Sequence, residues 1–305
     1  MATIAEAANP PARPLSVFAV LIMLLLCLSW GINNVMVKLA LHEVPPLMQA
    51  TARSIGGFLV IAMSCWLRGI PLFQRDGTLR AGLLMGTVFA LEFVVIFFGL
   101  LYTSASRAVI FVYTAPFFVA FGAVNFLGES LRPAQWAGLA LAFAGIVIAI
   151  GVPQADVTST VLFGDMLLIL GAIGWGGTTL IFKVSRLSKV PAEKTLLYQT
   201  GISAPILALG SYAIGETLTK MPGPVALASL AYQTFWVVGI TFLLWYVLMK
   251  SYSASKLTAF TFITPLFGVA AGHIVLNEPI SAAFAAAVAC VLAGLFLVNR
   301  PAKAA

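Results

Sequence analysis

Residues 104–107 read Ser-Ala-Ser-Arg, and residues 253–256 read Ser-Ala-Ser-Lys. Each copy is followed by a proline, a glutamate and a glycine, and each of these landmarks lies 149 residues from its counterpart: Pro116 and Pro265, Glu129 and Glu278, Gly145 and Gly294. Earlier in each half a Trp-Gly pair precedes a lysine, as Trp30 with Lys38 and as Trp175 with Lys183. A shared order of landmarks along the whole chain indicates a duplicated unit.

The composition is that of a membrane protein. Of the 305 residues, 61% are hydrophobic and 9% are charged, against roughly 25% charged in a soluble domain, and the mean hydropathy is +1.04. The apolar runs are about 20 residues long, which is enough for a helix to cross a hydrocarbon core of about 30 Å. We predict an all-α membrane protein with ten transmembrane helices, at residues 15–38, 45–67, 80–101, 104–127, 135–151, 163–183, 195–214, 228–249, 257–276 and 281–299.

The duplication predicts two units of opposite orientation. The first covers residues 1–151 and the second covers residues 152–305, with five spans in each. An odd number of spans inserts the second unit upside down relative to the first, which gives two inverted five-helix repeats. Such a pair suits alternating access, because exchanging the conformations of the two halves turns an outward-open cavity into an inward-open one.

The basic residues predict which side each loop faces. With ten spans both termini share a side, and of the 17 lysines and arginines only Lys38, Arg107 and Lys220 fall in loops on the other side, while Arg53 falls inside a span. Cytoplasmic loops carry the excess of lysine and arginine. We therefore expect both termini to be cytoplasmic, as short tails at residues 1–14 and 300–305.

Three ionisable residues lie inside predicted spans and have no ionisable counterpart in the other half. A carboxylate near mid-membrane costs on the order of 3 kcal/mol and often marks a transport pathway, so Glu92 is a candidate charge-coupling group, or else a protonated or paired structural residue. Arg53 could neutralise Glu92 across neighbouring helices, either as a static clasp or as a switch. His273 is a weaker candidate for charge coupling, and its alternative is a structural histidine.

Polar side chains mark one face of the first span, and the sixth span repeats the pattern at the same spacing: Trp30, Asn33 and Asn34, then Trp175, Thr178 and Thr179. Residues spaced i, i+3 and i+4 share a helix face, and polar groups within a bilayer turn away from lipid. We expect these six residues, with Tyr113 of the fourth span, to line a central cavity that binds substrate. The alternative is hydrogen bonding that holds the helices together.

Further residues are expected to shape or anchor the helices. A proline inside a span removes a backbone hydrogen bond and kinks the helix, so the repeated Pro116 and Pro265 are candidate hinges. Lys38 and Lys183 follow helix ends and are expected to extend towards the membrane surface. Arg107 is expected to anchor its span at the interface.

Several classes of function are excluded by missing motifs. The chain has no GxxxxGK[ST], HExxH or GxSxG motif, so neither ATP-driven transport by this chain alone nor hydrolysis is expected. Cys27, Cys65 and Cys290 lie in predicted spans without metal-ligand spacing. We predict no enzyme activity, no catalytic residue, no cofactor and no metal. The basic charge is explained by membrane anchoring and predicts no nucleic-acid partner.

These features resemble the drug/metabolite transporter superfamily and, within it, the bacterial EamA-type ten-span permeases. The resemblance covers about residues 15–300 and rests on the Trp-Gly pair in the first helix of each half and on the Ser-Ala-Ser-[Arg/Lys], proline and glutamate run through the fourth. It implies an inverted five-plus-five bundle, a cavity built mainly from the first, third, fourth, sixth, eighth and ninth helices, and export of amino acids, other metabolites or drugs, often with proton coupling. The family supplies no carboxylate that matches Glu92, so the role of Glu92 rests on its burial alone.

The sequence therefore favours a secondary active transporter in a bacterial inner membrane that exports a small organic metabolite, such as an amino acid or a related compound, by alternating access. Its expected partners are this small-molecule substrate and the lipid bilayer, and a proton is the candidate coupling ion. A multidrug efflux permease and a passive channel or facilitator are the alternatives. The sequence leaves the oligomeric state open.

Overall fold

The chain is a bundle of helices joined by short turns. The computed structural model describes residues 15–72, 74–151 and 158–300, and these ranges contain no strand. Nearly all of the two predicted tails and the predicted boundary between the units lie outside the described residues. The helices are α1 (Val17–Leu41), α2 (Pro46–Leu67), α3 (Leu79–Leu100), α4 (Ala105–Val112), α5 (Ala115–Phe126), α6 (Pro133–Ile150), α7 (Ser159–Val184), η1 (Arg186–Lys189), α8 (Ala192–Ala213), α9 (Pro224–Ala231), η2 (Tyr232–Thr241, a π-helix), α10 (Phe242–Ser251), α11 (Ala254–Phe260), η3 (Thr261–Ile263), α12 (Thr264–Leu276) and α13 (Phe284–Asn299).

The all-α membrane class predicted from the sequence is confirmed. Within the described residues, eight helical segments are long and apolar enough to cross a membrane, and α13 is apolar but shorter, with 16 residues. Helix α8 has 22 residues but is less apolar, because it carries Glu193, Lys194 and Gln199. The number of ten spans stays a prediction.

The repeated Ser-x-x-[Arg/Lys] motif starts a helix in each half. The hydroxyl of Ser104 accepts a hydrogen bond from the backbone N–H of Arg107, and the hydroxyl of Ser253 accepts one from Lys256. Each serine thereby satisfies one of the N–H groups that lack a partner at a helix start. The motif is therefore an N-cap, of α4 in one half and of α11 in the other.

Further along each half, the repeated proline follows a break in the helix, and the repeated glutamate follows the end of the helix. Pro116 lies in the first turn of α5 and Pro265 in the first turn of α12, where a missing N–H is tolerated. The residue before each glutamate is in the left-handed region, with φ 67° at Gly128 and φ 55° at Asn277. The sequence prediction of an interrupted helix holds at both prolines, and the spans divide into α4–α5 and α11–η3–α12.

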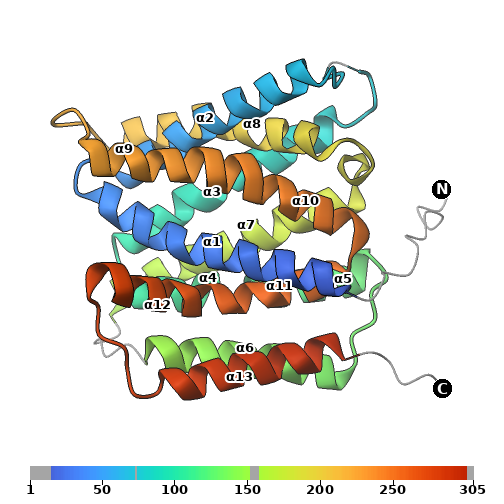
Figure 1. The fold of residues 1–305 in the computed structure, drawn as a ribbon, viewed down its shortest axis with the longest axis vertical. Coiled ribbons are helices and arrows are strands. Elements are labelled where there is room, and N and C mark those ends of the chain that lie inside the picture. The colour runs from blue at the N-terminus through green and yellow to red at the C-terminus, as the bar shows by residue number, and fades with distance from the viewer. Residues whose placement is uncertain (1–14, 73, 152–157, 301–305) are drawn as a thin grey trace.

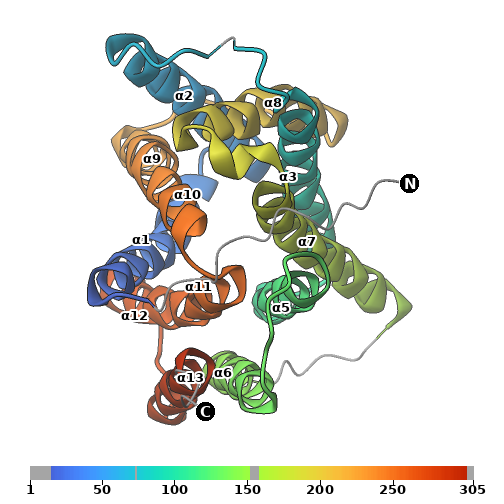
Figure 2. The ribbon, with the colours of Figure 1, turned by 90° about the vertical axis from the view of Figure 1, so that its right-hand side faces the viewer.

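The two ends of the bundle can be told apart by the termini. Helix α1 begins and α13 ends at the same end, which we call the terminal end; the turns at residues 42–45, 101–104, 214–223 and 277–283 lie at the far end (Figure 1). Seen along the helices, α1, α10, α3, α7, α5 and α11 surround a common centre, and α6 and α13 pack together to one side (Figure 2). The principal contacts join α6 to α13, α3 to α7 and α8, α2 to α8, α1 to α12 and α5 to α7.

The repeated glycines hold the α6–α13 pair together. A methyl group on Gly294 would lie 2.5 Å from the carbonyl oxygen of Gly138, and one on Gly145 would lie 2.7 Å from a methyl group of Val291. Small residues at a helix interface let two backbones approach closely in a membrane. These landmarks of the repeat are thus part of the scaffold.

Candidate functional site

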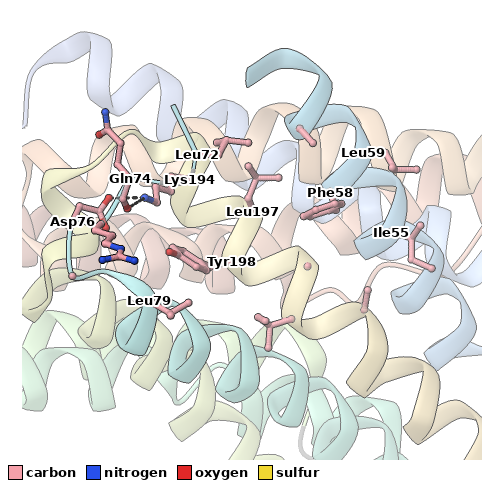
Figure 3. A pocket seen from close by; sticks show the side chains of 16 residues that line it. Ile55, Phe58, Leu59, Leu72, Gln74, Asp76, Leu79, Lys194, Leu197 and Tyr198 are labelled. Carbon is pink, nitrogen blue, oxygen red and sulfur yellow. Dashed lines mark hydrogen bonds and ion pairs between the residues drawn. The ribbon is translucent and has the colours of Figure 1, made fainter. Parts of the chain in front are cut away.

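Two hollows stand out in the described part of the chain. A groove of about 650 Å³ lies along α2, the turn that follows it, and α8, and is open to the outside (Figure 3). A cavity of about 250 Å³ lies inside the bundle, between α1, α2, α3, α4, α7, α8 and α10. The inner cavity is the candidate site because it brings together nine of the residues singled out in the sequence: Trp30, Asn33, Asn34, Arg53, Glu92, Tyr113, Trp175, Thr178 and Thr179.

The two repeated tryptophans stand in the cavity wall in different surroundings. The indole N–H of Trp30 donates to the hydroxyl of Thr241 over 2.9 Å, and its ring meets the edge of Trp245 at 5.7 Å between ring centres. The ring of Trp175 packs edge-to-face on Tyr113, also at 5.7 Å. Both indoles are therefore fixed by neighbours from other helices, as large aromatic side chains require in order to present a defined surface.

The hydroxyl groups of the sixth predicted span donate to their own helix. Thr178 and Thr179 both donate to the carbonyl oxygen of Trp175, over 2.8 and 3.3 Å. A hydroxyl that donates in this way keeps lone pairs that can accept a hydrogen bond from a ligand. These two residues therefore supply acceptors to the cavity.

Arg53 and Glu92 lie in the same cavity wall, and among the described residues no ion pair within 4.0 Å joins them. A pairing of the two, static or switching, stays a prediction. Each is deeply buried, with 6% and 8% of its surface exposed. The guanidinium carbon of Arg53 lies 4.4 Å from the centre of the Phe93 ring, a cation–π contact. The Nη2 atom of Arg53 and the Oε2 atom of Glu92 are both buried without a hydrogen-bond partner among the described residues.

Burial without a partner makes these two atoms unusual. An unsatisfied buried polar group costs about 1–3 kcal/mol, and more when it is charged. The Oδ1 atom of Asn33 is also buried and unpartnered. The cavity thus offers a cationic donor, a carboxyl group and an amide acceptor to a polar ligand.

Close packing positions Glu92. A methyl group added to Gly174 of α7 would lie 3.0 Å from the Cβ atom of Glu92, and one added to Gly171 would lie 2.4 Å from Ile96. The two glycines let α3 approach α7 closely, and this approach places the Cβ atom of Glu92 against α7.

His273 lies outside the cavity. Its side chain is exposed at the end of α12, and its Nδ1 atom lies 2.7 Å from the carbonyl oxygen of Glu278 in the turn that follows. This geometry favours the structural interpretation of His273. Pro116 and Pro265 lie at helix breaks outside the cavity lining, and their role as hinges stays a prediction.

The charged residues at helix ends form specific bonds, and their expected extension to the membrane surface stays a prediction. Lys38 pairs with Glu278 over 2.8 Å, and Lys183 donates to the carbonyl oxygen of Tyr252 over 2.6 Å. Arg107 pairs with Asp165 of α7, with both side chains largely buried. Periodicity could not predict these bonds, because each joins residues far apart in the sequence.

Sequence reasoning missed the aromatic part of the lining, which consists of Phe89, Phe93, Phe182, Phe242, Trp245 and Tyr246. In a chain this apolar, an inward aromatic residue has the same sequence signature as a lipid-facing one. Gln199 was also missed, although it stands at the position of the second half that matches Arg53. It accepts a hydrogen bond from the Tyr246 hydroxyl over 2.6 Å.

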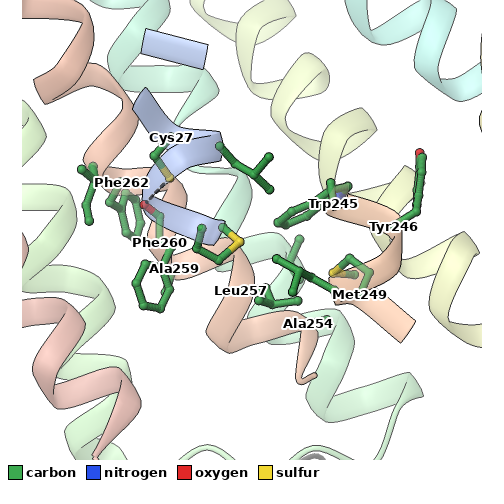
Figure 4. Close-up of a cluster of buried hydrophobic side chains, with 14 of the residues drawn as sticks. Cys27, Trp245, Tyr246, Met249, Ala254, Leu257, Ala259, Phe260 and Phe262 are labelled. Carbon is green, nitrogen blue, oxygen red and sulfur yellow. Dashed lines mark hydrogen bonds between the residues drawn. The ribbon is translucent and has the colours of Figure 1, made fainter. Parts of the chain in front are cut away.

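The cavity is closed towards the terminal end. Phe182, Tyr246 and Met249 are buried there, with the rings of the first two 4.9 Å apart. Tyr246 and Met249 belong to a buried hydrophobic cluster from α1, α10, α11 and η3, in which Cys27 lies beside Phe260 and Phe262 (Figure 4). Asn34, at the other side of the lining, is exposed. The cavity therefore opens towards the far end.

Comparison with known proteins points to one family. A model of the EamA-like transporter family matches residues 17–151 and again residues 162–300. The Probable amino-acid metabolite efflux pump of Salmonella typhimurium (strain LT2) is 28% identical, over 90% of this chain and 92% of that protein. The Uncharacterized transporter YvbV of Bacillus subtilis (strain 168) is 27% identical, over 93% of this chain and 92% of that protein. A crystal structure of a protein that is 21% identical has the same fold, with a TM-score of 0.79 over 92% of this chain and 98% of that chain.

Proposed function

Because the chain belongs to the EamA-like transporter family, we propose that it is a secondary active transporter that exports an amino acid or a related small metabolite by alternating access. By the positive-inside rule the terminal end faces the cytoplasm and the far end faces outwards. The conformation described is then outward-open. The name of the Salmonella relative, which refers to amino-acid metabolites, agrees with this substrate class.

The observation that carries the proposal is the set of unpartnered buried atoms in the cavity. The Nη2 atom of Arg53 is a donor suited to a carboxylate, and the Oε2 atom of Glu92 is an acceptor suited to an ammonium group. A zwitterionic amino acid carries both of these groups. Its side chain would lie against the aromatic lining, which supplies an apolar surface that side chains of different shapes can contact.

Proton coupling follows from the same carboxyl group. Glu92 can hold a proton or receive the ammonium group of the substrate, and the two compete for one site. A proton that binds from the outer side would release the substrate there, and substrate binding from the cytoplasmic side would release the proton. The expected exchange is therefore one of outward substrate for inward proton.

Two inverted repeats of five helices are part of the proposal, and the packing supports them. Under the repeat, α1 corresponds to α7, and the fourth predicted span corresponds to the ninth. The contact of α1 with α12 has its counterpart in the contact of α7 with α5, while the α2–α8 and α6–α13 contacts each correspond to themselves. A set of contacts that maps onto itself is what an inverted pair requires.

A carboxylate latch secures the closed end. At the terminal end, Glu129 accepts a hydrogen bond from the Ser253 hydroxyl over 2.7 Å and one from the backbone N–H of Ala254 over 2.8 Å. Lys183 binds the carbonyl oxygen of Tyr252 next to this pair. These bonds fasten the start of α11 to α5 and α7.

The corresponding groups at the far end are arranged differently. Glu278 matches Glu129, and Lys38 matches Lys183, but the two bind one another instead of the start of α4. Ser104 and Ala105, which match Ser253 and Ala254, are exposed. Closing the far end would move the Glu278 carboxylate onto Ser104 and Ala105, while the latch at Glu129 opens.

Transport by purified protein in liposomes tests the proposal. A panel of amino acids, nucleosides and lipophilic cations would be offered with and without a pH gradient. We expect accumulation of an amino acid against its gradient that collapses with a protonophore, and loss of this accumulation in Glu92→Gln and Arg53→Ala. Accumulation of the lipophilic cations would favour multidrug efflux, and equilibration without accumulation would favour a passive facilitator. Unchanged pH dependence in Glu92→Gln would refute the coupling role of Glu92.

A further inference from the structure

The external groove has an apolar wall on the outside of the bundle. Ile55, Phe58 and Leu59 of α2 are 39–60% exposed along it. The ring of Phe58 lies over Gly201 of α8, where an added methyl group would be 3.0 Å away. Figure 3 shows these side chains along one side of the groove and Gln74, Asp76 and Lys194 at its other end. The groove therefore changes from apolar to polar along its length.

The length of the groove matches one leaflet of a bilayer. Along α8 it extends from Lys194 to Ala204, and ten residues of helix advance about 15 Å. This is half of a hydrocarbon core of about 30 Å. Because α8 begins at the terminal end, the polar part lies at the membrane surface and the apolar part ends near mid-membrane.

The polar end carries an excess of positive charge. Lys194 is paired with Asp76 over 2.6 Å, and this ammonium group, with the Thr78 hydroxyl, holds the pKa of Asp76 well below its usual range, so the pair stays charged and mutually neutralised. Arg75 lines the groove, is exposed, and has no acidic partner among the described residues. The guanidinium group of Arg186 lies against Gly77 of the same turn. Arg75 thus remains to bind an anion in the groove, and Arg186, which does not line it, donates to the carbonyl oxygen of Asp76.

We propose that the groove binds an anionic phospholipid of the adjacent leaflet, with one acyl chain along Phe58 and Leu59 and the headgroup phosphate against Arg75. The positive-inside rule makes this the cytoplasmic leaflet, which is rich in anionic lipid. The groove combines an apolar part as deep as one leaflet with an exposed arginine at its polar end. A lipid fits both parts, because its acyl chain can cover the apolar part, whereas a water-soluble ligand has no acyl chain to bury there. The lipid would bridge α2 and α8, which belong to different predicted repeats, and would thereby stabilise their packing.

Native mass spectrometry of the full chain in detergent tests this site. Phosphatidylglycerol and phosphatidylcholine with identical acyl chains would be added in equal amounts, and we expect preferential retention of phosphatidylglycerol. Arg75→Gln should lower phosphatidylglycerol binding about fivefold, the effect of one basic residue near a membrane surface, and should lower phosphatidylcholine binding less, because the choline group already neutralises its phosphate. Ala62→Trp, which fills the groove, should lower the binding of both lipids.

Matched variants separate this site from general lipid contact. Arg80→Gln removes an exposed charge near the groove that does not line it, and Ala137→Trp adds the same bulk to an exposed position on α6; neither should change lipid binding. Equal retention of the two lipids by the wild type, or equal losses in the control variants, would overturn the proposal. The spectra would also overturn the proposal if the wild type has the mass of a dimer and Ala62→Trp has the mass of a monomer, because the groove would then bind a second copy of the chain.

A second measurement keeps the test independent of variant folding. Phosphatidylglycerol with a photoactivatable acyl chain would be cross-linked to the wild-type chain and the labelled peptides identified. We expect labels on α2 and α8 within the groove. Equal labelling of α6 and α13 would contradict the site.

Discussion

Residues 104–116 and residues 253–265 carry the same motif and adopt different surroundings. In the second segment all side chains except that of Lys256 are buried, whereas in the first, leaving Ser106 aside, only Ala108, Ala115 and Pro116 are buried. Both segments begin with the same serine cap and end at the same proline. The difference therefore does not come from the motif. It comes from what each segment packs against.

One contact present in only one half accounts for part of the difference. Arg107 holds α4 against α7 through Asp165. Its counterpart Lys256 has no ion pair in the described chain, because Val20 stands in α1 where Asp165 stands in α7. The start of the exposed segment is thus fastened to α7, and the start of the buried one is fastened by the Glu129 latch.

The strongest test fastens the buried segment permanently. In a Cys290→Ala background, Glu129→Cys with Ser253→Cys should be joined by a short bifunctional thiol reagent, because the native side chains are in contact. Transport in liposomes should fall to the level of empty liposomes and return on reduction, since alternating access requires this end to open. The matched pair Ser104→Cys with Glu278→Cys should cross-link only while substrate is being transported. Undiminished transport after the first cross-link would show that the segment does not move.

Releasing the exposed segment should have the next largest effect. Asp165→Asn leaves Arg107 without its ionic partner, and breaking a buried pair costs about 3–5 kcal/mol. We expect about 2 kcal/mol here, because Arg107 lies at the end of a span where water can reach it, and so a shift of about 30-fold towards a closed far end. The labelling rate of Val112→Cys by a membrane-impermeant thiol reagent from the far side measures this shift. Asp165→Glu keeps the charge and should label like the parent; slowing in both variants would point to general damage.

Weakening the latch should have a smaller effect in the opposite direction. Glu129→Gln keeps one acceptor for Ser253 or Ala254 and loses the charge, at a cost of about 1.5 kcal/mol. The terminal end should then open about tenfold more often. Labelling of Thr258→Cys, which is buried in α11, should accelerate by that factor when the reagent is applied from the terminal side. Glu278→Gln is the control and should not accelerate it.

The sequence predicted the motifs of the fold better than the contacts of the site. The expected kinks at Pro116 and Pro265 coincide with helix breaks, because the effect of a proline is local. In the sequence, Ser104 and Ser253 stand out only as landmarks of the repeat, and the structure shows that they are N-caps. A polar stripe in an apolar chain also predicts which face turns inward, and Trp30 and its neighbours do line the cavity. Their role in binding substrate stays a prediction.

Contacts between distant residues could not be predicted in this way. Arg107 and Asp165 are 58 positions apart, and nothing in either span names the other as its partner. Nothing in the sequence indicates that Arg53 would lie over the Phe93 ring. The two repeated segments are also unequally buried, and a sequence that repeats its motif carries no sign of which copy will be the buried one.

The smallest effect on transport is expected at the ion pair at the far end. Lys38 and Glu278 form an ion pair with 53% and 43% of their side chains exposed, and such a pair is worth about 0–1 kcal/mol. If both residues change partners when the far end closes, Lys38→Met and Glu278→Gln should each lower the transport rate threefold or less. The double variant should lose no more than Glu278→Gln alone, because Glu278 contributes the bonds to Ser104 and Ala105. A double-mutant cycle of initial transport rates measures this coupling. Fully additive losses would mean that the two residues act independently, and the exchange of latches between the two ends would then have to be abandoned.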